Sequence, residues 1–144
     1  MKFLKVKNAI SKEVITCQSD CTIEEISKLM VEKNIRTVII ENKIGNPVGL
    51  VSGGDIVKAV AKKLPSNTTA GEIVGKELIK IDSNEDIVTA ATLMNDSDIK
   101  RLAVVENEKI VGVLTSTDVL KYSPQYLQEF ASTLEKLDSI IKKL

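Results

Sequence analysis

The sequence predicts a mixed α/β (α+β) fold of two β-α-β-β-α repeats packed with pseudo-two-fold symmetry, followed by a C-terminal helix. The main observation is that the run Gly49–Ile56 returns as Gly112–Val119. Each run has a glycine, two aliphatic residues, a hydroxyl residue, two small residues, an aspartate and an aliphatic residue. The aspartates, Asp55 and Asp118, are 63 positions apart (118 − 55). Such a period is typical of similar units that complete each other's core.

The repeat extends well beyond this run. At an offset of 64 (76 − 12), residues 12–15 match residues 76–79, and residues 35–40 match residues 99–104. The first repeat therefore carries one extra residue in the turn at positions 42–47. Turns tolerate insertions, so this difference is consistent with a duplication.

Each repeat predicts the same elements in the same order. A short amphipathic segment at 6–10 or 70–74 leads into a strand at 14–17 or 78–81. A helix follows in each repeat. Thr22, with Glu25 in a capping box, caps it in the first repeat, and Asp86 caps it in the second. Two β-branched runs then predict strands at 37–40 and 48–51, and at 102–105 and 110–114. A second helix is expected over 56–63, and from Val119 onward.

Breaker residues suggest the domain boundaries. The first repeat is placed at 1–63, a linker at 64–69, the second repeat at 70–122 and a further helix at 123–144. Pro124 suits the first turn of this helix, whose apolar face either folds back on the core or packs against another copy. It is a candidate output element.

The amino-acid composition disfavours several classes of function. The 144 residues are 43% hydrophobic but only 3% aromatic, without tryptophan, and 20 basic residues balance 20 acidic ones. A nucleic-acid surface normally shows a basic excess and stacking aromatic residues. Cys17 and Cys21, without any histidine, cannot complete a tetrahedral zinc site within one chain. No apolar run reaches membrane-spanning length, so a cytoplasmic protein is expected.

The repeated runs, with residues 34–40 and 98–105, resemble the cystathionine-β-synthase (CBS) domain. The resemblance covers about residues 6–121 as a tandem pair, a Bateman module. It implies that adenosyl compounds such as AMP, ADP, ATP or S-adenosylmethionine bind in clefts between the repeats. It also implies that Asp55 and Asp118 hold ribose hydroxyls, while Ser52 and Thr115 reach phosphates.

Physical chemistry supports these roles. A carboxylate accepts hydrogen bonds from both ribose hydroxyls, and free N–H groups at a helix start favour phosphate. Gly53 and Gly54 would allow close approach of a ligand. Ser116 and the bulkier Thr117 replace them, so the two sites need not bind alike. The alternative is that the Ser, Thr and Asp residues are only helix caps.

Five further residues are weaker candidates. Arg36, Lys100 and Arg101 precede the central strands and would neutralise phosphate, or they are solvated surface charges. Ile15 and Ile79 would line an adenine pocket, or they belong to the core. Their neighbours Thr16 and Lys80 should point the opposite way.

The leading interpretation is a non-catalytic module that binds an adenine nucleotide and signals through a conformational or oligomeric change. By the resemblance, it would form a homodimer through its CBS modules and regulate a separate protein or its own oligomer. The alternatives are a sensor of S-adenosylmethionine or methylthioadenosine, or an interaction or nucleic-acid-binding module without nucleotide control. An enzyme is disfavoured, because Asp55 and Asp118 lie in separate repeats and form no evident acid–base pair.

Overall fold

The computed structural model describes residues 4–10, 14–74, 78–122 and 141–143 of the chain. By their contacts these residues form two compact units. The first-repeat unit spans residues 14–78, and the second-repeat unit combines residues 1–13 with residues 79–144. Most of the C-terminal helix expected at 123–144 falls on positions 123–140 and 144, outside the described residues.

The first-repeat unit is built on a three-stranded sheet in the order β1-β2-β3. Strand β1 runs parallel to the central strand β2, and β3 runs antiparallel to it. Val38 and Ile40 of β2 pack with α1 in the core, since alternate residues of a strand share one face. The elements are β1 (Thr16–Gln18), α1 (Ile23–Lys33), β2 (Thr37–Glu41), β3 (Pro47–Ser52), α2 (Gly53–Ala61) and α3 (Ala70–Ile73).

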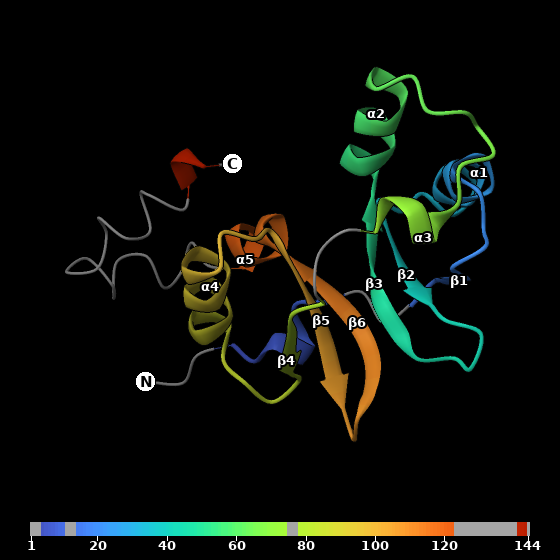
Figure 1. Cartoon of the computed structure of the whole chain (residues 1–144). Helices are drawn as coiled ribbons and strands as arrows, with labels where there is room; N and C mark the ends of the chain where they lie inside the picture. The colour runs from blue at the N-terminus through green and yellow to red at the C-terminus, as the bar shows by residue number, and fades with distance from the viewer. Residues whose placement is uncertain (1–3, 11–13, 75–77, 123–140, 144) are drawn as a thin grey trace. The chain divides into compact units, whose positions relative to one another are not determined.

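The second-repeat unit has the same topology, in the order β4-β5-β6 (Figure 1). Leu102 of β5 and Leu114 of β6 are fully buried and pack with α4 and α5. Its elements are a 3-10 turn (Val6–Asn8), β4 (Lys80–Asp82), α4 (Ile87–Asp96), β5 (Arg101–Glu106), β6 (Lys109–Thr115) and α5 (Ser116–Tyr122). The predicted α+β class and the repeated β-α-β-β-α order are therefore confirmed.

Thr22 and Asp86 cap the first helix of each repeat as predicted, but only one of the two hydrogen bonds of the predicted Thr22–Glu25 capping box forms. The Glu25 amide donates to Thr22 Oγ1 at 3.1 Å, and the Thr89 amide donates to the Asp86 carboxylate at 2.7 Å.

The predicted starts of the second helices, at Ile56 and Val119, were wrong by three residues. These helices begin at Gly53 and Ser116, because the preceding hydroxyl residue caps the first turn. The first strands also begin two residues later than predicted, at Thr16 and Lys80.

The segment that leads into the first repeat packs on the body of the second. The Val6 amide donates to the Glu85 carbonyl at 2.8 Å, and the Ile87 amide donates to the Leu4 carbonyl at 2.8 Å. The Val6 side chain is 0% exposed and belongs to the core of α4, β5 and β6. This segment therefore completes the second-repeat unit.

The segment that leads into the second repeat packs on the body of the first. The Ala70 amide donates to the Cys21 carbonyl at 2.7 Å, and the Ile23 amide donates to the Thr68 carbonyl at 2.8 Å. Ala70 is fully buried in the core of α1, β2 and β3. Each unit therefore contains sequence from both repeats, which follows from tertiary contacts rather than from sequence order.

The β5–β6 hairpin turn offers a simple stability prediction. Asn107 and Glu108 have φ angles of 51° and 66° between the paired residues Glu106 and Lys109. Glycine adopts this left-handed conformation without the steric penalty of a side chain. We expect Glu108→Gly to raise the free energy of unfolding by about 0.5–1 kcal/mol in denaturant titrations. The matched change Lys109→Gly, within β6, should lower it; a lower value for Glu108→Gly would contradict the argument.

Candidate functional site

The junction of β3 and α2 joins Ser52 and Asp55 in a reciprocal cap. Asp55 Oδ2 accepts the Ser52 amide at 2.8 Å and the Ser52 hydroxyl at 2.9 Å, while the Asp55 amide donates to Ser52 Oγ at 3.3 Å. Ser52 is 6% exposed, whereas Asp55 is half-buried. No described residue donates a hydrogen bond to Asp55 Oδ1.

The junction of β6 and α5 repeats this geometry with Thr115 and Asp118. Asp118 Oδ2 accepts the Thr115 amide at 2.9 Å, and the Asp118 amide donates to Thr115 Oγ1 at 3.1 Å. Asp118 Oδ1 likewise accepts no hydrogen bond from the described residues. Each aspartate therefore serves as a cap with one oxygen and keeps a second oxygen for an external donor. A cap and a ligand site are compatible at the same residue.

The backbone brings the predicted cations to these junctions. The Gly53 amide donates to the Arg36 carbonyl, and the Ser116 amide donates to the Lys100 carbonyl, both at 2.9 Å. The side chains of Arg36 and Lys100 are exposed. Arg101 pairs directly with Thr115 across β5 and β6, so the two side chains share one face of the sheet.

The small residues after each hydroxyl residue form the first helical turn. A Cβ added at Gly53 would have no neighbour within 4 Å, and one at Gly54 would contact only Ser52 Oγ, at 3.6 Å. At the corresponding positions Ser116 is buried and Thr117 is exposed. The first junction therefore has open space that Ser116 and Thr117 partly fill in the second.

Ile15 and Ile79 pack beside the cores of their units, Ile15 in the first-repeat unit and Ile79 in the second. Each also contributes its carbonyl, which accepts the amide of Ile39 or of Ala103 at 3.0 or 2.9 Å. Their role in an adenine pocket stays a prediction.

Lys80 was not among the predicted site residues. It pairs with Ala103, two residues from Arg101 along β5, and so lies on the same sheet face as Arg101 and Thr115. The corresponding residue of the first repeat is Thr16. Comparison of the two repeats position by position would have singled out this difference in charge.

The chain matches the CBS domain over residues 6–62 and again over residues 70–125. It belongs to the CBS domain family. The two matched stretches contain both junctions described above. They also include the two leading segments, each of which belongs to the unit formed mainly by the other repeat.

Individual relatives support this assignment to the CBS family. The chain is 30% identical to protein MK0525 of Methanopyrus kandleri, over 94% of this chain and 71% of the relative. It is 31% identical to protein MJ1404 of Methanocaldococcus jannaschii, over 85% of this chain but only 32% of that protein. Among solved structures it resembles the CBS domain pair of protein MJ0100 in complex with 5′-methylthioadenosine and S-adenosyl-L-methionine. That likeness has a TM-score of 0.74 and 30% identity and covers 83% of this chain and 95% of the other.

The two cysteines of this CBS protein are half-buried beside the core of the first-repeat unit. Burial, with the neighbouring Cys21 thiol and the Glu25 carboxylate, raises the pKa of Cys17 to about 12. Cys17 therefore stays a protonated thiol at neutral pH and is a poor nucleophile.

Among the described residues no group of three or more His, Cys, Asp or Glu side chains is placed to hold a metal ion.

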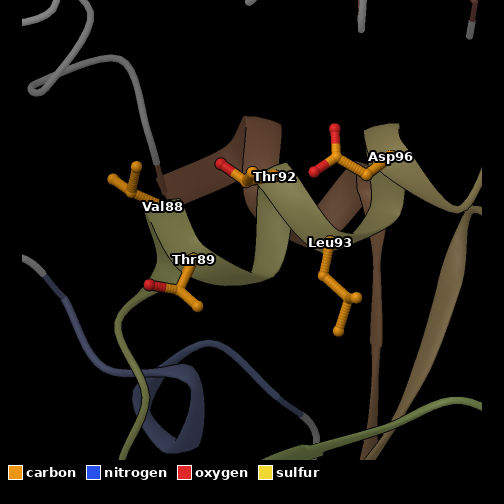
Figure 2. Close-up of a pocket in the computed structure, with 5 residues that line it drawn as sticks. All are labelled: Val88, Thr89, Thr92, Leu93 and Asp96. Atoms are coloured by element: carbon orange, nitrogen blue, oxygen red, sulfur yellow. The ribbon is translucent and has the colours of Figure 1, made fainter.

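A hollow of about 320 Å³ lies on the surface of α4, away from the predicted site residues (Figure 2). Val88, Thr92 and Asp96 lie along one side of the helix, and Thr89 and Leu93 complete the lining. Within the described part of the chain, α4 alone supplies the lining residues of this hollow. Within the described ranges, none of the helices has the length and apolar character needed to cross a membrane.

Proposed function

We propose that this CBS domain pair is a regulatory module that binds adenosine-containing ligands, with AMP, ADP or ATP as the leading candidates. The observation that carries the proposal is the free carboxylate oxygen of Asp55 and of Asp118. A ribose presents two hydroxyl donors, and a carboxylate oxygen held by its own cap is a fixed acceptor for them. The same arrangement occurs in both repeats.

The surroundings of the aspartates favour a nucleotide. A hydroxyl residue precedes each aspartate by three positions; the carbonyls of Arg36 and Lys100 accept amides at the two junctions, and Arg101 pairs with Thr115. Charge-assisted hydrogen bonds from such groups to phosphate oxygens are stronger than neutral ones. The ribose would be held by the carboxylate and the phosphate by the hydroxyl and basic groups.

A second candidate ligand is a sulfur-containing adenosyl compound. The CBS pair of MJ0100 was solved with 5′-methylthioadenosine and S-adenosyl-L-methionine. These compounds retain the adenosine ribose and lack phosphate, so the aspartates would act in the same way. The basic residues would then contribute little to binding.

Regulation follows from a difference in affinity. A bound ligand shifts the module between two arrangements only by as much as it binds one more tightly than the other. The response would be passed to a separate protein or to an oligomer of this chain, such as a homodimer. The segment 123–144 remains the candidate output element.

A thermal-shift experiment tests the proposal. The purified chain is melted with AMP, ADP, ATP, S-adenosylmethionine or methylthioadenosine, and a ligand that binds only the folded state raises the midpoint. At about 100 times the Kd we expect an increase of roughly 5–10 °C for at least one ligand. The control is the double variant Asp55→Asn/Asp118→Asn, which should show a clearly smaller increase. If no ligand shifts the wild-type midpoint, the aspartates are only caps and the proposal fails.

A further inference from the structure

The two repeats differ in charge on the sheet face that carries the candidate site. Position 80 is lysine where position 16 is threonine, and position 101 is arginine where position 37 is threonine. Lys80, Arg101 and Thr115 share one face of the second sheet, because Lys80 pairs with Ala103 and Arg101 pairs with Thr115.

The corresponding face of the first sheet has no charge at the matching positions. Thr16 pairs with Ile39, and Thr37 pairs with Ser52, so the equivalent positions carry hydroxyl groups only. Arg36 and Lys100 occupy matching positions and are both exposed, so they do not distinguish the repeats. The difference between the two faces near the aspartates is therefore two additional cations in the second repeat.

Arg101 has no counter-charge in the described structure. Its Nε atom is buried without a hydrogen-bond partner, and neither Arg101 nor Lys80 forms an ion pair with the described residues. The nearby acidic group on this face, Asp82, pairs with Val105 at the other end of β5 and accepts the Asn84 amide. A buried donor nitrogen without a partner is unfavourable, and a bound anion would supply that partner.

The two hydroxyl groups differ as well. Ser52 donates its hydroxyl proton to Asp55 Oδ2 at 2.9 Å. Thr115 Oγ1 accepts the Asp118 amide, and no described residue accepts its proton. The Thr115 hydroxyl is therefore free to donate to a ligand oxygen, whereas the Ser52 hydroxyl is occupied.

We propose that the second-repeat site takes an adenosyl ligand with a 5′-phosphate, and that the first-repeat site takes one without phosphate, such as a thioether. This assignment rests on the proposed function, since it concerns the same aspartates. The phosphate accepts donors from Arg101, Lys80 and Thr115, and a guanidinium can bind two of its oxygens at once. At the second-repeat site a sulfonium ligand would meet like charge, which disfavours it.

AMP and 5′-methylthioadenosine are matched probes, because they share adenosine and differ at the 5′ position. Calorimetric titration of Asp55→Asn protein reports the second-repeat site alone, and titration of Asp118→Asn protein reports the first. We expect AMP to bind more tightly than methylthioadenosine in the former and more weakly in the latter. Equal ratios of the two affinities at both sites would overturn the assignment.

Exchange of the differing residues sharpens the test. In the Asp55→Asn background, Arg101→Thr should lower the affinity ratio of AMP to methylthioadenosine roughly 10- to 100-fold. Lys80→Thr, at an exposed position, should also lower this ratio. It replaces Arg101→Thr as the test if that variant folds poorly. In the Asp118→Asn background, Thr37→Arg should raise the ratio.

The control is Lys109→Thr, which removes one exposed cation from the hairpin end of the same sheet and should leave the ratio unchanged. If both probes bind but neither Arg101→Thr nor Lys80→Thr alters the ratio, this assignment is wrong while the proposed function stands. If neither probe binds the wild-type chain, the assignment fails, and the thermal-shift series with all five ligands decides whether the proposed function stands.

Discussion

Replacement of Asp118 by asparagine is expected to weaken ligand binding at the second-repeat site strongly while leaving the fold intact. An asparagine oxygen can still accept the Thr115 amide that Asp118 Oδ2 accepts at 2.9 Å. Its NH2 group cannot accept ribose hydroxyls in place of Oδ1. Hydrogen bonds to charged groups contribute strongly, so we expect at least a 10- to 100-fold loss of affinity by calorimetry, with little change in midpoint.

Two further variants separate the ligand role from the cap. Asp118→Ala removes both oxygens and should lose binding and also about 1 kcal/mol of stability. Asp86→Asn alters another aspartate cap of the same unit, at α4, and should leave binding unchanged. If Asp118→Asn binds AMP and methylthioadenosine with wild-type affinity, Asp118 is only a helix cap.

Replacement of Val6 by aspartate is expected to unfold the second-repeat unit, although Val6 belongs to the first repeat in sequence. The Val6 side chain is 0% exposed among residues of α4, β5 and β6. Burial of a valine side chain contributes about 1.5–3 kcal/mol, and an unpaired carboxylate at the same place adds a desolvation penalty. We expect Val6→Ala to cost about 2 kcal/mol and Val6→Asp considerably more.

Hydrogen exchange shows which unit responds. Protection should be lost first in residues 80–122 and retained longer in residues 16–61, because Val6 packs only on the second-repeat unit's core. Lys7→Asp, at an exposed neighbouring position, should leave both regions protected. Loss confined to residues 16–61 would show that the leading segment belongs to the first repeat's own core.

Local patterns were sufficient for much of the fold. The helix caps Thr22 and Asp86 were predicted because a side-chain oxygen that accepts the amide three residues ahead needs only adjacent residues. The central strands followed from runs of buried aliphatic residues such as Val38–Ile40. The helix starts at Ile56 and Val119 were wrong, because Ser52 and Thr115 belong to β3 and β6 and also serve as caps.

The candidate site was predictable only in part. Internal repetition singled out Ser52, Asp55, Thr115 and Asp118, and the structure joins each pair by hydrogen bonds. Sequence alone could not place Lys80 beside Arg101, because the positions are joined by strand pairing across the sheet rather than by sequence order. It also could not show that one carboxylate oxygen of each aspartate is free.

The sequence by itself therefore determined the CBS repeat, its element order and the residues of each junction, because these depend on interactions within a few residues. Only the tertiary structure decided that each unit takes its leading segment from the other repeat. It also decided that the Nε atom of the half-buried Arg101 has no hydrogen-bond partner among the described residues. Both depend on contacts between distant parts of the chain, where burial and unpaired charge are set by the neighbours that folding brings together.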